Sequence, residues 1–418
     1  MKTRHLAALI SACCAVPALA QTSITIYGIA DAGIQASRFG SGTQYNLASG
    51  MTDGSRLGFK GTEDLGGGFK ALFTLESRIE LDTGDNRNGF LGKHPSFALL
   101  RGAPLPTASS LALATALSQS NAAVNSNGAL FDRTAMVGLV TPAGAVLLGR
   151  QYTPAYEIGA IADTFETGTV GGWGGITTGT GALYTPGVAI RSSSAIQYRL
   201  QFPNGLGAAF MYSPEDRGSG SLGVSNRFVG GNLRYQANGY DIGIGYNRED
   251  DAFGNRSLRT GVVGGSYTMG KMKFFAGYMS MRNDNPSLGF ALTPTLTAAL
   301  GTAGAALVPT VVTAINSNAR LDAESYSLGM HYTIGAGRLM GAIGHTKNAL
   351  FPASDVTLIS LGYDHNLSKR TDVYLFFAHA NNQANAQYAL GGAGYSGGFT
   401  TTGGQDARAV QLGIRHRF

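Results

Sequence analysis

Charged side chains alternate with apolar ones in several segments of the chain, so that each charged set shares one face of an extended strand. A charge on the lipid face of a membrane strand is costly near the bilayer midplane, so such groups point into water. Rings of charged groups around water set the ion preference of pores. We therefore expect the following residues to line a water-filled channel: Arg56, Lys60, Glu76, Arg78, Arg133, Arg191 and Arg199.

Residues that could perform catalysis are dispersed along the chain. After the first 20 residues, six histidines remain: His94, His331, His345, His365, His379 and His416. The sequence contains neither the HExxH spacing of zinc hydrolases nor the G-x-S-x-G turn of serine hydrolases. We expect no metal site, no cofactor and no catalytic residues. An outer-membrane barrel enzyme with a Ser-His or Asp-His site assembled between strands remains the enzymatic alternative.

The first 20 residues have the pattern of a cleaved signal peptide. Lys2 and Arg4 precede the apolar stretch 6–16, and Ala18-Leu19-Ala20 forms a small-residue cleavage site, so residues 1–20 are the expected signal and 21–418 one domain. Lipoprotein cleavage before Cys13 is the competing interpretation. Signal cleavage after residue 20 removes both cysteines of the chain, which excludes disulfides and thiolate sites.

Composition narrows the class of protein further. Glycine contributes 61 of 418 residues, and charged residues only 13%, about half of the usual share. The mean hydropathy of +0.02 is the value expected when each strand averages an apolar face with a polar one. Removal of Lys2 and Arg4 leaves 29 basic against 25 acidic residues, a net charge of +4. These basic residues are scattered, so we expect no nucleic-acid partner.

Strict alternation is the main secondary-structure signal. In residues 323–335, Tyr326, Leu328 and Met330 fall on one face of a strand, whereas Ser325 and Ser327 fall on the other. Sixteen such segments are predicted, at 23–36, 54–64, 69–82, 131–141, 145–153, 190–202, 206–215, 227–237, 240–249, 257–269, 272–283, 323–335, 338–349, 355–367, 371–382 and 407–418.

The connections between these segments alternate in length. Short turns such as Asn238-Gly239 alternate with long connections such as 83–130 and 284–322. This pattern predicts an all-β fold, a sixteen-stranded antiparallel transmembrane β-barrel with short periplasmic turns and long external loops. A soluble all-β protein is the alternative, but it would need a buried partner for each apolar face. Segment 290–315 contains Pro294 and Pro309, so we expect a long loop there with at most a helical turn near 296–307.

Four segments resemble the trimeric general porins of betaproteobacteria and Neisseria. They are the opening strand QTSITIYGIADAG at 21–33, the hairpin at 54–76, the hairpin at 131–152 and the closing strand VQLGIRHRF at 410–418. Strand spacing extends the resemblance over nearly the whole mature chain. Segments 92–130 and 284–322 are longer than the corresponding loops of that family.

This resemblance implies a passive diffusion channel for ions and small hydrophilic solutes in the outer membrane. It implies a homotrimer, contact with outer-membrane lipid and lipopolysaccharide, and recognition of the terminal Phe418 by the barrel-assembly machinery. It also implies a third loop, residues 152–189, folded into the lumen with the acids Glu157, Asp163 and Glu166. Basic residues outnumber acids in the expected lumen set, so we expect a mild anion preference. A receptor or adhesin that uses the long loops is the remaining alternative.

Overall fold

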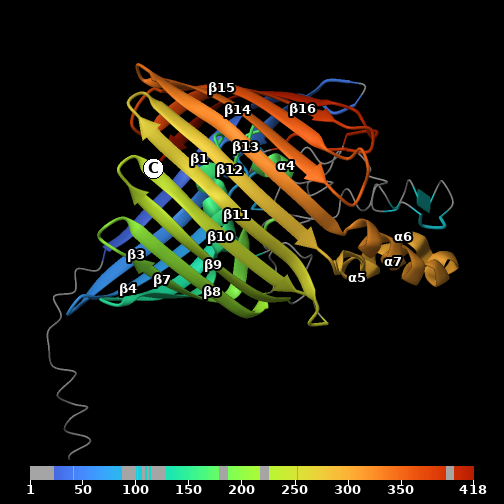
Figure 1. The fold of residues 1–418 in the computed structure, drawn as a ribbon, viewed down its shortest axis with the longest axis horizontal. Helices are drawn as coiled ribbons and strands as arrows, with labels where there is room; N and C mark the ends of the chain where they lie inside the picture. Colours follow the sequence, from blue (N-terminus) through green and yellow to red (C-terminus); the bar gives the residue numbers. More distant parts are fainter. Residues whose placement is uncertain are drawn as a thin grey trace, which may run out of the picture.

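The computed structural model describes residues 23–40, 42–86, 100, 102–105, 109–110, 113, 129–177, 187–216, 226–251, 253–391 and 400–418. The expected signal peptide and part of the connection 83–130 lie outside these residues. The described chain forms one closed ring of antiparallel strands (Figure 1).

Seventeen strands make up the sheet. Their bounds are β1 (Ser23–Arg38), β2 (Gln44–Ser49), β3 (Arg56–Gly66), β4 (Phe69–Arg78), β5 (Thr134–Thr141), β6 (Gly144–Tyr152), β7 (Arg191–Gln201), β8 (Leu206–Asp216), β9 (Asn226–Ala237), β10 (Tyr240–Asp250), β11 (Arg256–Met269), β12 (Met272–Asn283), β13 (Leu321–Ile334), β14 (Gly337–Asn348), β15 (Val356–Asn366), β16 (Thr371–Asn382) and β17 (Ala407–Arg417). Helices α3 (Pro154–Ala162) and α4 (Gly174–Thr177) connect β6 to β7, and α5 (Leu288–Ala291), α6 (Thr293–Gly304), the 3₁₀ turn η2 (Ala305–Leu307) and α7 (Val308–Asn318) connect β12 to β13.

The barrel nevertheless has sixteen wall positions, as the alternation predicts. β2 and β3 pair with different halves of β1: residues 23–29 of β1 pair with β3, whereas residues 32–37 pair with β2. The two strands therefore share the second position in the wall. The ring closes where β1 pairs with β17.

The two faces of the wall differ as the sequence predicts. On β13, Leu328 is 61% exposed on the outer face, whereas Ser325 and Ser327 are buried on the inner face. Large apolar side chains are exposed in the same alternating way on the outer face of most other strands. An outer apolar band of this kind requires hydrocarbon around it, which a bilayer provides.

The segment between β12 and β13 is helical, so the prediction of a long loop there was wrong. Pro294 and Pro309 each lie in the first turn of a helix, where the missing N–H costs nothing. Gly301, with a φ of +61°, kinks the helical stretch instead of ending it. Among the described residues, Thr293–Asn318 is the one helical stretch long and apolar enough by composition to cross a membrane, and 28% of its apolar 18-residue window is buried.

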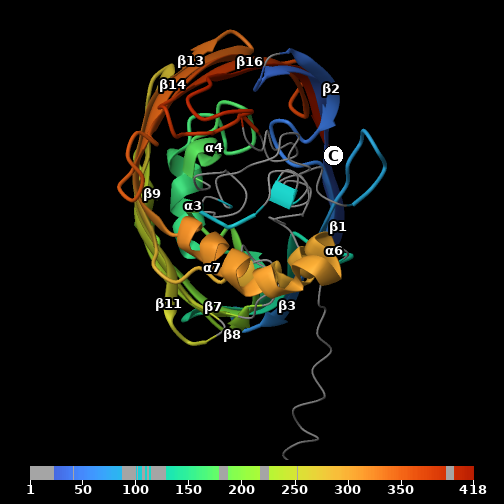
Figure 2. The same cartoon turned by 90° about the vertical axis from the view of Figure 1, so that its right-hand side faces the viewer.

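These helices pack on another connection at the same end of the barrel. Leu100 and Leu113, from the connection between β4 and β5, are buried in one apolar cluster with Leu296, Val311 and Ile315 of the helices. Figures 1 and 2 together place α6 and α7 beyond the strand ends, across part of the mouth at the long-loop end.

Candidate functional site: the channel lumen

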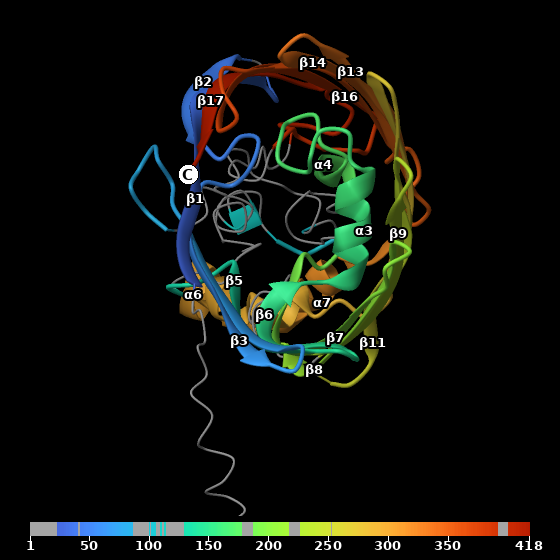
Figure 3. The same cartoon turned by 90° about the vertical axis from the view of Figure 1, so that its left-hand side faces the viewer.

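Helix α3 lies inside the ring of strands, against one side of the wall (Figures 2 and 3). It packs mainly on β10 and β11. Two glycines of β10 allow this close approach, because a Cβ on Gly243 would lie 2.6 Å from Ile158 Cδ1 and one on Gly245 would lie 2.8 Å from Ala155 Cα. The Asn247 side chain accepts a hydrogen bond from the Ala155 N–H at 3.1 Å and so fixes the start of the helix.

The chain that follows α3 is tied to strands farther round the barrel wall. The Val170 N–H donates to Gln411 Oε1 on β17 at 3.1 Å. The Trp173 indole N–H donates to Ser325 Oγ on β13 at 2.8 Å, and Ser360 Oγ on β15 donates to the Gly171 carbonyl at 3.0 Å. The connection between β6 and β7 therefore follows the inner wall from β9 to β17.

The tip of this connection rests on the segment between β2 and β3. A Cβ on Gly168 would overlap the carbonyl oxygen of Thr52, so the two backbones are in direct contact. Asp31 on β1 holds that segment in place, because its carboxylate accepts the N–H groups of Thr52 at 2.7 Å and Asp53 at 2.9 Å. Tyr374 on β16 donates its hydroxyl to the other oxygen of the same carboxylate at 2.6 Å.

Three of the predicted arginines converge near the start of α3. Arg133 Nε donates to Glu76 Oε1 at 2.5 Å, and Arg56 Nη1 lies 3.7 Å from Glu76 Oε2. Arg133 and Arg191 both donate to the Tyr152 hydroxyl, at 3.1 and 2.6 Å. The guanidinium groups therefore share one carboxylate and one phenol. We refer to Arg56, Glu76, Arg133, Tyr152 and Arg191 as the arginine cluster.

Aromatic stacking joins the arginine cluster to α3. The Arg191 guanidinium lies 4.3 Å from the centre of the Tyr152 ring, a cation–π contact. The Tyr152 ring in turn stacks on Tyr156 of α3, with ring centres 5.3 Å apart and planes 9° from parallel. The Tyr156 hydroxyl lies 3.3 Å from Thr167 Oγ1, so this stack extends to the tip of the connection.

The acids predicted on the third loop have three different environments. Glu157 forms an ion pair with Arg199 and accepts a hydrogen bond from Asn232 Nδ2 at 3.1 Å. Asp163 is buried at the end of α3 and accepts the N–H groups of Phe165 at 2.9 Å and Gly174 at 3.2 Å. Burial raises the pKa of the Asp163 carboxyl to about 6, although backbone N–H groups oppose the shift.

Glu166 belongs to a second charged cluster that strand alternation alone does not predict. Arg338 Nη1 donates to Glu166 Oε1 at 2.6 Å, and Arg415 Nη1 lies 3.7 Å from Glu166 Oε2. Asp364 and Asp372 complete this cluster on β15 and β16. Burial opposes ionisation of Glu166, but Arg338 and Arg415 outweigh it and lower the pKa of Glu166 to about 2.

Two further predicted residues lie next to the arginine cluster, because Arg78 on β4 pairs across from Arg56 and Lys60 is four residues farther along β3. The Arg78 side chain is buried and ion-paired with Glu80, and the backbone N–H of Arg78 donates to Asp132 Oδ1 at 2.9 Å. Lys60 is exposed, with Nζ 5.1 Å from the centre of the Tyr27 ring. The described residues hold no group of three or more His, Cys, Asp and Glu side chains arranged to bind a metal ion.

Phe418 completes the seam of the barrel at the short-turn end. Its N–H donates to the Gly28 carbonyl at 3.1 Å, and its carbonyl accepts the Gly28 N–H at 3.0 Å. Its ring covers the Cα of Gly28, where a Cβ would overlap the ring.

The chain matches the Gram-negative porin family over residues 6–385, which is most of its length. It therefore belongs to the Gram-negative porin family. It is an outer-membrane channel for ions and small hydrophilic solutes and not an enzyme, as the sequence predicts.

Two porins resemble the chain over nearly all of their length. It is 26% identical to outer membrane porin protein 32 of Delftia acidovorans, over 96% of this chain and 95% of that protein. It is also 26% identical to an outer membrane porin of Bordetella pertussis over the full length of both. The solved anion-selective porin from Comamonas acidovorans shares the fold, with a TM-score of 0.67, 24% identity, and coverage of 95% of this chain and 100% of that one.

Proposed function

We propose that this porin prefers anions, and that the connection between β6 and β7 forms its constriction opposite the arginine cluster. The observation that supports this proposal is the convergence of Arg56, Arg133 and Arg191 on the single carboxylate of Glu76 and the hydroxyl of Tyr152. Asp53, which is ion-paired with Arg56, is a second acid at this place. Three positive and two negative charges leave a net charge of +1, and the neighbouring Arg78 and Arg150 are balanced by Glu80 and Asp132.

The other charged groups of the lumen add little to this sum. In the second cluster, Arg338, Arg415 and Arg417 are paired with Glu166, Asp364 and Asp372, which gives a net charge of zero. Arg199 is neutralised by Glu157 and Arg234 by Asp241. The positive excess therefore lies at the arginine cluster, and Lys60 on the same face of β3 as Arg56 adds to it.

The members of the arginine cluster have different roles in this proposal. The side chains of Arg133 and Arg191 are almost fully buried, so they position Tyr152 and Glu76. They act on a passing ion only through the electric field of their charges. Arg56 is less buried and Lys60 is exposed, so these two contribute most directly to the potential felt by a passing ion. At physiological salt the screening length is about 8 Å, so only charges near the narrow section act on the ion.

A reversal potential under a KCl gradient tests the preference. We expect the native channel to be anion-selective, and the double variant Arg56→Gln with Lys60→Gln to be less so. Arg370→Gln, which removes an exposed charge from the turn between β15 and β16, should leave the reversal potential unchanged. A cation-selective native channel, or a double variant with the native reversal potential, would refute the proposal.

We also propose that the protein is a homotrimer, that lipopolysaccharide surrounds its outer half, and that the barrel-assembly machinery reads Phe418. The resemblance to trimeric porins supports the trimer, and a solved porin with the same fold, OmpT of Vibrio cholerae, has a trimer form. Extraction in mild detergent should give an oligomer that heat converts to monomers. Extraction of monomers alone from native membranes would contradict the trimer.

A further inference from the structure

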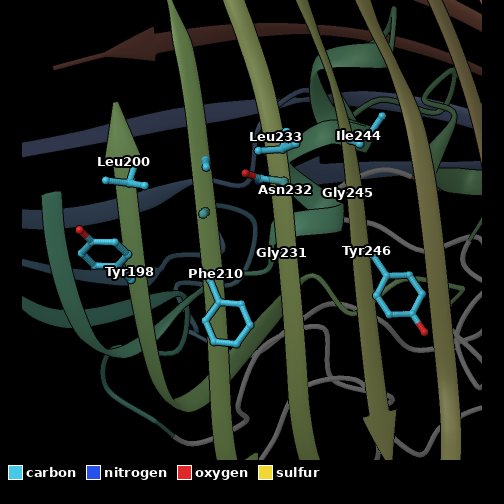
Figure 4. Close-up of a pocket in the computed structure, with 11 residues that line it drawn as sticks. Tyr198, Leu200, Phe210, Gly231, Asn232, Leu233, Ile244, Gly245 and Tyr246 are labelled. Carbon is cyan, nitrogen blue, oxygen red and sulfur yellow. The ribbon is translucent and has the colours of Figure 1, made fainter. Parts of the chain in front are cut away.

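A groove runs over the outer face of β7–β10, where small residues interrupt the apolar band (Figure 4). Cross-strand pairing places Tyr198, Phe210, Gly231 and Tyr246 in one row. Leu200, Ala208, Leu233 and Ile244 form the adjacent row. Gly231 and Ala208 form the floor, and Figure 4 shows Phe210 and Tyr246 on either side of Gly231.

The shape and chemistry of the groove suit a hydrocarbon chain. Its volume is about 380 Å³, within the range of roughly 300–1,000 Å³ typical of small-molecule sites. Its lining is almost entirely apolar, and it faces the bilayer, where acyl chains are the available ligand. The wall behind the groove is backed by α3, which packs against Gly245 on the luminal side.

Two arginines lie on the same outer face, toward the long-loop end. Arg248 is two residues beyond Tyr246, and Arg227 is four residues from Gly231, which correspond to about 7 and 13 Å along the strands. One carboxylate holds both side chains: Arg227 Nε donates to Asp250 Oδ2, and Arg248 Nη2 donates to Asp250 Oδ1, each at 2.8 Å. The Asp250 side chain is buried, whereas that of Arg227 is 51% exposed.

The arginines and the groove together match an amphiphile with an anionic head. The arginine pair and Asp250 have a net charge of +1, and guanidinium groups bind phosphate through paired hydrogen bonds. One leaflet of the hydrocarbon core is roughly 15 Å thick, so an acyl chain below a head group at Arg227 and Arg248 reaches the groove. The long-loop end of a porin faces the outer leaflet, which in Gram-negative bacteria consists of phosphorylated glycolipid.

We propose that this surface binds one lipid A unit of lipopolysaccharide, with a phosphate at Arg227 and Arg248 and an acyl chain over Gly231 and Ala208. This assignment rests on the proposed contact with lipopolysaccharide. It makes that contact specific, because the lipid then has one defined binding place on the outer wall. The site lies on the outer face, so ion conduction through the lumen does not depend on it.

Native mass spectrometry of the detergent-solubilised porin with added bisphosphorylated lipid A tests the site. We expect one tightly retained lipid per protomer. Ala208→Phe fills the groove, and Arg227→Gln removes the more exposed arginine, so each should reduce retention by roughly tenfold. Gly231→Ala adds one methyl group to the floor and serves as the second groove variant if Ala208→Phe fails to fold.

Matched controls lie on the same outer face but outside the groove. Ala276→Phe and Arg282→Gln on β12 should leave lipid retention unchanged, and single-channel conductance should be native in every folded variant. Equal loss in the control variants would show a non-specific lipid annulus and overturn the proposal. So would equal retention of dephosphorylated lipid A, or displacement of lipid A by an equal concentration of phosphatidylglycerol. Loss of conductance would instead count against the channel and not against the lipid site.

Discussion

The hydroxyl of Tyr374 on β16 donates to Asp31 on β1, 2.6 Å away, across the intervening strand β17. The same carboxylate accepts the N–H groups of Thr52 and Asp53, on which the tip of the luminal connection rests at Gly168. Asp31 thus links the seam of the barrel to the segment that supports the proposed constriction.

Two variants separate these roles of Asp31. Tyr374→Phe removes one donor but leaves the backbone contacts, so it should lower the free energy of unfolding by about 1.5–3 kcal/mol with native conductance. Asp31→Ala releases Thr52 and Asp53 and should alter single-channel conductance as well. Urea unfolding and planar-bilayer recordings of both variants check this, and native conductance of a folded Asp31→Ala protein would disprove the link.

Replacement of Gly168 should move the tip of the connection into the lumen. A Cβ at this position overlaps the carbonyl oxygen of Thr52, and the wall behind cannot yield. Gly168→Ala should therefore cost about 1–3 kcal/mol of stability and reduce single-channel conductance. Gly174→Ala is the matched control, because its Cβ would meet its nearest neighbour at 3.9 Å. A change of equal size in both variants would show that the contact with Thr52 is not special.

The ion pairs of Glu166 should give a defined acid dependence. Since the pKa of Glu166 falls from 4.5 to about 2 on folding, its stabilising contribution is complete above pH 4.5 and is lost as the pH falls toward 2. Glu166→Gln should therefore lower the midpoint of thermal unfolding at pH 7 and pH 5, and the difference from the native protein should vanish near pH 2. Glu63→Gln on β3, outside the cluster, serves as the control. A difference that persists unchanged at pH 2 would contradict the assignment.

Phe418 should matter for assembly more than for synthesis. Its deletion removes both backbone hydrogen bonds to Gly28 and the ring that covers this residue, whereas Phe418→Ala removes the ring alone. We expect the deletion to reduce heat-modifiable, folded protein several-fold relative to total protein on an immunoblot, and Phe418→Ala to have a smaller effect. Equal folded fractions in all three proteins would show that the seam does not need this residue.

The strands could be predicted because the membrane makes their outer face apolar along its whole length. Sixteen predicted segments match strands of the structure, with ends that differ by four residues at most. β2 is the exception. Tyr45 and Leu47 of this strand are exposed on the outer face, so alternation was present, but six residues give too few repeats to distinguish a strand from a loop.

The charges of the lumen were only partly predictable, for a different reason. Alternation places residues of strands, so it gives no position for Asp53 in the connection between β2 and β3. The predicted segments 69–82 and 131–141 included Glu80 and Asp132, but both acids lie just beyond the ends of β4 and β5, beside the arginines. It places Arg338 and Arg415 on inner faces without showing that they meet Glu166, because this meeting depends on the path of the luminal connection. The helices at 293–318 were missed because the prolines, glycines and threonines of this segment were weighed against a helix, although each proline begins one.

The helices across the mouth affect the electric field even though they carry no charge. Residues 287–319 contain no Asp, Glu, Lys, Arg or His, so this part of the mouth is material of low polarisability. Field lines from the charged groups of the lumen avoid such material and crowd into the water that remains, an effect called dielectric focusing. An uncharged insertion thereby strengthens the attraction that the positive excess at the arginine cluster exerts on an approaching anion. Capture of ions should consequently respond to the length of α6 and α7 most strongly at low ionic strength.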